Sequence, residues 1–251
     1  MKKLSVILIL IFCVFLCGCV KKPQTSLDEI KERGNLTVGV KFSAKPFGYI
    51  ENGELQGFDI DIAKKIAGEI FDDENKVEFI EVNSEDRISK LMSGEIDMII
   101  ATMTDTPERR LIVDFSEPYY FSGQAVLCKK NSEVTSAADL KNHNTVVVTG
   151  TTAEKTLQKL YIRSNVIRVF DYKKAFEAIN DDTCLIADEA LLQGFVMDNE
   201  GYQIFNKKLS QEPYAVALRK DEPELKQAVD YTIKYLEESG ELDKIKDKWV
   251  K

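Results

Sequence analysis

Strands and helices alternate along the chain from residue 35 onward, and this order restricts the fold more than any other feature of the sequence. Short apolar runs at 35–40, 77–82 and 96–101 predict buried strands. The segments 59–71 and 86–93 between them predict helices, the first with an apolar stripe along one face. A β-α-β-α-β order favours a parallel sheet with helices on both faces and a ligand at the carboxyl ends of the strands. The loops that leave the three strands should therefore lie close together.

The start of the sequence has the composition of an export signal. Two lysines precede an apolar run at 4–16 that is too short to span a bilayer as a helix, which predicts a signal peptide over 1–18. Residues 16–19, Leu-Cys-Gly-Cys, resemble the cleavage box of bacterial and archaeal lipoproteins. This resemblance implies that Cys19 becomes the lipidated first residue of the mature protein. A plain signal peptide or an uncleaved anchor would also export the domain.

A second α/β set follows residue 120. Its expected strands lie at 145–149, 166–170, 184–187 and 214–218, and its last helix lies at 222–238. The first of these strands runs into a Gly-Thr-Thr turn and a helix, where backbone N–H groups are free to bind an anion. The fold class is therefore α/β, and a doubled set in an exported chain predicts two lobes around a cleft.

Composition excludes several functions. The net charge of -8 argues against a nucleic-acid partner and against binding to an anionic membrane surface. His143 is the only histidine in the sequence, so neither a histidine-based metal site nor a Ser-His-Asp triad is expected. The sequence also lacks the ATP-binding pattern G-x-x-x-x-G-K-[ST]. We therefore expect no metal, no cofactor and no ATP hydrolysis by this chain.

Two of the five cysteines, Cys128 and Cys184, lie beyond the leader. They could form a disulfide in an oxidising compartment, but their positions in the sequence do not show how close their Cα atoms come. We expect two free thiols.

The segment 96–120, IDMIIATMTDTPERRLIVDFSEPYY, combines the end of a strand, three hydroxyls and a predicted helix start. The hydroxyls belong to Thr102, Thr104 and Thr106, and the proline after the last of them predicts an N-cap and a first helical turn that contains Arg109. Free N–H groups, hydroxyls and a guanidinium together can hold and neutralise a small carboxylate. The alternative is an ordinary strand-to-helix turn with surface arginines.

Three motifs carry a resemblance to a known family. Thr-x-Thr-x-Thr-Pro-Glu-Arg, Asp-Phe-Ser-Glu-Pro-Tyr-Tyr and, earlier in the chain, Gly-Phe-Asp-Ile-Asp resemble the extracytoplasmic solute-binding proteins of polar amino-acid ABC importers. The resemblance covers essentially the whole mature chain. It implies a two-lobed periplasmic-binding-protein fold of type II and a lipid-anchored monomer outside the cell membrane. The implied partners are an amino acid, a membrane permease and the ATPase of that permease.

The resemblance also implies how the chain is divided between the lobes. A tether and a short helix are expected over 19–34. Lobe 1 would then comprise 35–120 and 214–251, and lobe 2 would comprise 123–210, with crossings at 119–123 and 210–214. Ligand capture would proceed by closure of the lobes about these crossings.

Charges near the expected cleft indicate the class of ligand. Where many family members carry an acid after the first strand, this chain has Lys41, and Ala44 and Ser84 stand where aromatic residues are common. Arg87 adds a further cation to the rim that contains Arg109. Because a cluster of like charges is unfavourable when it is partly desolvated, the ligand should bring about two negative charges.

The same pattern is similar to the aspartate/glutamate-binding branch of the family. By that resemblance, Arg109, Thr104 and the N–H of Thr152 hold the α-carboxylate. Asp188 and the backbone near Thr102 hold the α-ammonium.

Lys41 and Arg87 would then hold the side-chain carboxylate, and Thr151 would add a hydroxyl from lobe 2. Each assignment has an ordinary alternative: a solvated loop lysine, an arginine at a helix start, and an N-cap at Asp188.

Other functions on this fold stay open. The chain could serve an importer for glutamine or cystine, or it could sense a ligand without transporting it. Some proteins of this fold are exported dehydratases, which need a carboxylic acid positioned as a proton donor. The sequence has no paired acid beside Arg109 for that role, so we expect a binding protein and not an enzyme.

Overall fold

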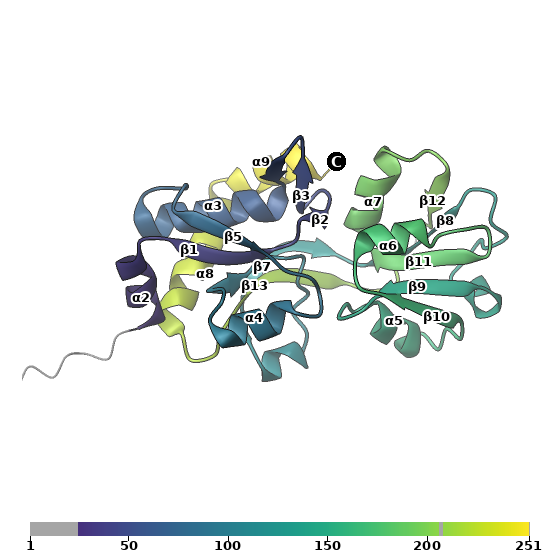
Figure 1. The fold of residues 1–251 in the computed structure, drawn as a ribbon, viewed down its shortest axis with the longest axis horizontal. Coiled ribbons are helices and arrows are strands. Elements are labelled where there is room, and N and C mark those ends of the chain that lie inside the picture. The colour runs from purple at the N-terminus through teal and green to yellow at the C-terminus, as the bar shows by residue number, and fades with distance from the viewer. Residues whose placement is uncertain (1–24, 206–207, 251) are drawn as a thin grey trace, which may run out of the picture.

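The computed structural model describes residues 25–205 and 208–250, and the signal peptide and Cys19 lie outside this range. Two five-stranded sheets, each flanked by helices, lie one after the other along the long axis of the molecule (Figure 1). Across the described part of the chain, no helix combines the length and the apolar character needed to cross a membrane. The predicted α/β class with two lobes is confirmed.

The first sheet and its helices form lobe 1. Its strands, in spatial order, are β5 (Val77–Glu81), β1 (Leu36–Val40), β6 (Met98–Ile99), β13 (Glu212–Leu218) and β7 (Asp114–Ser122). Its helices are α2 (Ser26–Arg33), α3 (Phe58–Phe71), α4 (Arg87–Ser93), α8 (Pro223–Glu238) and α9 (Glu241–Trp249). The expected parallel pairing holds for β5, β1 and β6, whereas β13 runs antiparallel to β6 and β7. The carboxyl ends of the parallel strands therefore meet at one edge of the sheet.

The second sheet and its helices form lobe 2. Its strands, in spatial order, are β10 (Asn165–Val169), β9 (Asn144–Val148), β11 (Thr183–Asp188), β8 (Gln124–Lys129) and β12 (Tyr202–Ile204). Its helices are α5 (Ala153–Lys159), α6 (Tyr172–Glu177) and α7 (Glu189–Met197), with a short 3₁₀ helix at Asp139–Asn142. Strands β9, β10 and β11 are parallel, and β8 runs antiparallel to β11 and β12.

A small antiparallel sheet, which the sequence pattern did not predict, separates β1 from α3. It consists of β2 (Ser43–Ala44), β3 (Gly48–Glu51) and β4 (Glu54–Gln56). It extends from lobe 1 toward α7 of lobe 2 (Figure 1).

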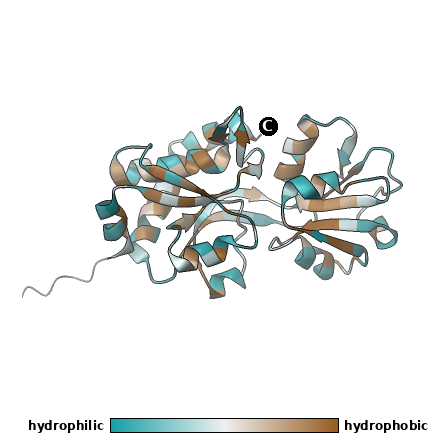
Figure 2. Ribbon diagram, in the orientation of Figure 1, coloured by the Kyte–Doolittle hydropathy of each residue, from teal (hydrophilic) through white to brown (hydrophobic). Residues whose placement is uncertain are grey.

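Apolar residues are concentrated in the strands of both sheets and recur along the helices beside them (Figure 2). In β1, Val38 and Val40 have no exposed surface, and the same holds for Ile62 and Ile66 of α3. These positions have the two-residue and four-residue spacings that place side chains on one face of a strand or a helix. The core of lobe 1 thus follows directly from the sequence pattern.

The two lobes are joined by a ribbon of antiparallel strands. Strand β7 continues into β8, and β13 pairs with β7 so that Glu212 lies opposite Ser122 and Tyr214 lies opposite Tyr120. Helix α8 then packs against β7 and α3, which returns the C-terminal segment to lobe 1.

Two elements near the predicted junction differ from expectation. The strand expected at 96–101 is limited to Met98–Ile99, and the helix expected after Thr106 is a turn followed by a 3₁₀ helix, Arg109–Leu111. Val113 and Phe115, immediately downstream, are buried in the core of lobe 1. Their packing draws the chain into β7 before a full α-helix can form.

The expectation of two free thiols is wrong, because Cys128 and Cys184 form a disulfide with their Cα atoms 4.6 Å apart. Cys128 is in β8 and Cys184 is in β11, and the register that pairs Leu127 with Leu185 places the two cysteines opposite each other. The pairing of strands that are distant in the sequence decides this contact, and the spacing of the cysteines does not reveal it.

Replacing both cysteines with alanine should lower the free energy of unfolding by about 3 kcal/mol, because the disulfide closes a loop that otherwise adds entropy to the unfolded chain. Urea denaturation followed by circular dichroism measures this difference. The reducing agent dithiothreitol should destabilise the native protein and leave the double variant unchanged. Equal stability of the two proteins under oxidising conditions would contradict the prediction.

Candidate functional site

The loops at the carboxyl ends of the strands gather where the two lobes meet. Lys41 follows β1, Arg87 begins α4 after β5, and Thr102 follows β6. All three side chains are buried, with exposed fractions of 5%, 2% and 4%. The predicted proximity of these loops is confirmed.

Lys41 is buried without a carboxylate partner among the described residues. Its Nζ donates a hydrogen bond to Oγ1 of Thr102 over 2.8 Å and lies 4.9 Å from the ring centroid of Tyr172, which belongs to lobe 2. Burial, and then the charge of Arg87, lower the pKa of Lys41 to about 7. The ammonium is therefore poised to gain from any anion placed beside it.

Arg87 also lacks a carboxylate partner within the described ranges. Its Nη1 donates to the carbonyl of Ala101 over 2.8 Å, while Nη2 lies 3.5 Å from the carbonyl of Gly150. Its Nε has no hydrogen-bond partner in the described part of the chain. Burial, followed by the charge of Arg109, lowers the pKa of Arg87 to about 9.

Arg109 links the lobes directly. Its Nη1 donates to the carbonyl of Thr104 over 2.7 Å, and its Nη2 donates to the carbonyl of Gly150 in lobe 2 over 2.9 Å. Gly150 has φ +74°, and a Cβ at this position would lie 2.3 Å from the carbonyl oxygen of Ser84. Only glycine allows lobe 2 to approach lobe 1 this closely.

Asp188 ends β11 and faces the cleft with an exposed fraction of 5%. It accepts a hydrogen bond from Nε2 of Gln124 over 3.0 Å. Although it precedes α7, its side chain does not cap that helix. Burial, with a further contribution from the charge of Glu212, raises the pKa of Asp188 to about 6, and the charge of Lys41 opposes this shift. The ordinary alternative of an N-cap is therefore not realised.

Asp59 is a functional candidate that the sequence analysis missed. Its carboxylate accepts hydrogen bonds from the N–H of Thr102 and the hydroxyl of Tyr119, each over 2.9 Å. Thr102 has φ +47°, in the left-handed region that β-branched residues disfavour. Asp59 therefore holds the loop after β6 in its strained conformation. The signals in the sequence were its place in the Gly-Phe-Asp-Ile-Asp motif and its position on the apolar side of an amphipathic helix.

Glu212 is a second residue that the sequence analysis missed. Its Oε2 accepts hydrogen bonds from the hydroxyls of Thr104 over 2.5 Å and Thr152 over 2.7 Å. The Thr104 hydroxyl therefore cannot also donate to an α-carboxylate, and the expected role of Thr104 changes. The hydroxyl of Thr151 donates to the carbonyl of Val148 within lobe 2, so it too is unavailable as a donor to the ligand.

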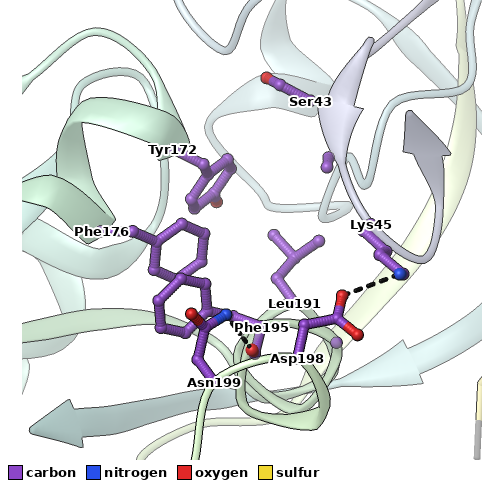
Figure 3. Close-up of a pocket in the computed structure, with 10 residues that line it drawn as sticks. Ser43, Lys45, Tyr172, Phe176, Leu191, Phe195, Asp198 and Asn199 are labelled. Atoms are coloured by element: carbon purple, nitrogen blue, oxygen red, sulfur yellow. Dashed lines mark hydrogen bonds and ion pairs between the residues drawn. The ribbon is translucent and has the colours of Figure 1, made fainter. Parts of the chain in front are cut away.

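Two cavities border this cluster. One of about 680 Å³ is lined by Thr104, Thr152 and Glu212, among others. The other, of about 120 Å³, lies between the small sheet of lobe 1 and helices α6 and α7, where Tyr172 and Phe195 form part of its wall (Figure 3).

Ion pairs across the cleft show that the two lobes are closed on each other. At the smaller cavity, Lys45 of lobe 1 pairs with Asp198 of lobe 2 over 2.9 Å (Figure 3). At the larger cavity, Lys155 of lobe 2 pairs with Glu108 of lobe 1 over 3.2 Å.

Comparison with known proteins gives the family of this chain. Residues 36–251 match the family described as bacterial extracellular solute-binding proteins, family 3. The chain is 36% identical over 268 residues to the ABC transporter glutamine-binding protein GlnH of Bacillus subtilis (strain 168). This alignment covers 100% of this chain and 98% of that protein. It is 32% identical over 241 residues to the glutamate/aspartate import solute-binding protein of Escherichia coli (strain K12), over 90% of this chain and 80% of that protein.

A solved structure agrees with this result. The cysteine-binding protein from Campylobacter jejuni superposes with a TM-score of 0.86 at 34% identity, over 90% of this chain and 93% of that one. The expected resemblance to solute-binding proteins of polar amino-acid importers is thereby confirmed. The chain belongs to family 3 of the bacterial extracellular solute-binding proteins.

Proposed function

We propose that this protein captures an acidic amino acid, aspartate or glutamate, outside the cytoplasmic membrane and delivers it to an ABC permease with its ATPase. One observation carries the proposal: Lys41 and Arg87 are both buried at the junction of the lobes, and neither forms an ion pair with a carboxylate of the described residues. A buried cation without a counterion is costly, and a ligand carboxylate supplies the missing charge.

The α-carboxylate and the α-ammonium of the ligand would also find partners in the site. The guanidinium of Arg109 is partly exposed and already bridges the lobes, so it can form a bidentate pair with the α-carboxylate. Asp188 supplies a negative charge for the α-ammonium. The Thr104 oxygen can accept a hydrogen bond from the same ammonium, because its own proton is donated to Glu212.

Glutamine is the main competing ligand, since the relative named as glutamine-binding shares slightly more identity than the one named for glutamate and aspartate. An amide in place of the side-chain carboxylate would leave Lys41 and Arg87 without a counterion. The charge of the site therefore favours the acidic ligand, whereas the single methylene between aspartate and glutamate contributes only about 1–3 kcal/mol.

The proposal also covers how the protein is attached to the membrane and its role as a binding protein without catalytic activity. Lipidation of Cys19 would tether a monomer to the outer side of the membrane. Both carboxylate oxygens of Asp59 and of Glu212 accept hydrogen bonds from N–H and O–H donors of the protein, and Asp188 is assigned to the ligand ammonium, so these three acids would not act as proton donors in a dehydration. Ligand binding would shift the lobes toward the closed arrangement, which the permease would then accept.

Replacing Arg109 with lysine should raise the dissociation constant for aspartate and glutamate about 100-fold, because lysine keeps the charge but loses the two-pronged contact. Titration calorimetry on protein that was unfolded and refolded to remove carried-over ligand measures this change. Arg110→Lys is the matched control, since Arg110 is exposed and pairs with Asp105. If Arg109→Lys binds as tightly as Arg110→Lys, the α-carboxylate is held elsewhere.

Replacing Lys41 with methionine should weaken acidic ligands at least about tenfold more than glutamine, because only acidic ligands lose an ion pair. Dissociation constants for aspartate, glutamate and glutamine give this ratio. Lys45→Met serves as the control, because Lys45 is a more exposed lysine at the edge of the cleft and should affect all three ligands alike. Equal losses for acidic ligands and glutamine in Lys41→Met would refute the assignment of the side-chain carboxylate.

Binding of an acidic ligand at pH 8 should take up protons. Without ligand, the pKa of Lys41 is about 7, so the amine is largely neutral at pH 8, and a carboxylate beside it raises this pKa. The affinity for aspartate should therefore fall as the pH rises above 7, by up to about tenfold per pH unit. Calorimetry in phosphate and in Tris, which differ in heat of ionisation, detects the uptake. Lys41→Met should abolish it, and release of protons by the native protein would contradict the prediction.

A further inference from the structure

Glu212 collects three hydroxyl groups in the crossing between the lobes. It is the first residue of β13, and its exposed fraction is 3%. In addition to Thr104 and Thr152 on Oε2, the hydroxyl of Ser210 donates to Oε1 over 2.8 Å. Hydrogen bonds to a buried carboxylate are charge-assisted and are roughly twice as strong as neutral ones.

The two hydroxyls on Oε2 come from different lobes. Thr104 forms an isolated β-bridge with Tyr214, so it stays beside Glu212 whatever the position of lobe 2. Thr152 precedes α5 and is further held by Nε2 of Gln124, the first residue of β8, over 3.1 Å. A rotation of lobe 2 about the crossings would therefore break the Thr152–Glu212 hydrogen bond and leave the Thr104–Glu212 bond intact.

The exposed ion pairs across the cleft are weaker candidates for holding the lobes together. In the Lys45–Asp198 pair the side chains are 37% and 58% exposed, and in the Lys155–Glu108 pair they are 58% and 62% exposed. Exposed ion pairs contribute about 0–1 kcal/mol. The Thr152–Glu212 bond is buried on both sides, with Thr152 9% exposed.

The Glu212 carboxylate also determines the direction in which the hydroxyl groups of Thr104 and Thr152 donate their hydrogen bonds. A carboxylate only accepts, so Thr104 must donate to it, and the remaining lone pairs of Thr104 are left to accept a hydrogen bond. Thr152 donates to Glu212 and accepts from Gln124.

We propose that Glu212 is a positioning residue that stabilises the closed arrangement of the lobes before any ligand binds and orients Thr104 toward the ligand ammonium. The first part is independent of the ligand, and the second rests on the proposed function. Because apparent affinity scales with the fraction of molecules that are closed, Glu212 would determine affinity without contacting the ligand.

The test is small-angle X-ray scattering of ligand-free protein. Glu212→Leu removes the acceptors and keeps a side chain of similar size, so the radius of gyration should increase as the lobes open. Glu212→Gln keeps one acceptor oxygen and should fall between the native protein and Glu212→Leu. Ser93→Ala is the control, because the Ser93 hydroxyl donates to the carbonyl of Lys90 within α4 of lobe 1, so its scattering should equal that of the native protein.

Titration with aspartate provides the second readout. Glu212→Leu should raise the dissociation constant at least about tenfold, in proportion to the loss of closed molecules. If Glu212→Leu scatters like the native protein and binds aspartate equally well, the proposal is overturned.

Failure of the proposed function and failure of the proposed role of Glu212 would give different results. If the native protein binds no acidic amino acid, the proposed function fails, while the ligand-free scattering still decides the role of Glu212. If Glu212→Leu does not fold, Thr152→Val removes the same hydrogen bond from the lobe 2 side and should produce the same opening. A closed Thr152→Val protein would then overturn the proposal.

Discussion

The burial of two unpaired cations at the junction of the lobes is the constraint on which the rest of the site depends. Among the described residues, Lys41 and Arg87 contact a hydroxyl, backbone carbonyls and the face of Tyr172, and the charges of Asp188 and Asp59 act on Lys41 without forming an ion pair with it. Such an arrangement raises the free energy of the ligand-free closed state, since desolvated charges of one sign repel each other. Under the proposed function, this cost would favour a ligand that brings a second negative charge, because such a ligand would remove it.

Buried acids keep the closed state accessible despite this cost. Asp59 stabilises the left-handed conformation of Thr102, whose hydroxyl is the hydrogen-bond partner of Lys41. Asp188 lies in lobe 2 and Glu212 lies in the crossing between the lobes, and both affect the pKa values of neighbouring groups through their charges. The site therefore combines buried charges of both signs, and β13, which begins in the crossing between the lobes, contributes Glu212.

Much of this arrangement could be predicted from local patterns. The apolar runs predicted β1, β5, β9 and β11 to within a residue or two at each end, and the loops after these strands do converge. The junction around Arg109 was only partly predicted. Its residues are at the cleft, but a 3₁₀ helix replaces the expected α-helix because Val113 and Phe115 must enter the core. Local preference for a helix start was overridden by tertiary packing.

The sequence by itself determined the α/β class, the two-lobed family and the residues that carry charge to the cleft, because periodicity, turn chemistry and short motifs are local properties. Only the tertiary structure decided which distant groups meet. The Cys128–Cys184 disulfide depends on the register of β8 and β11, and the contacts of Glu212 join Thr104 of one lobe to Thr152 of the other. Hydrogen bonds and disulfides form over a few ångströms in space, and separation along the chain does not encode that distance.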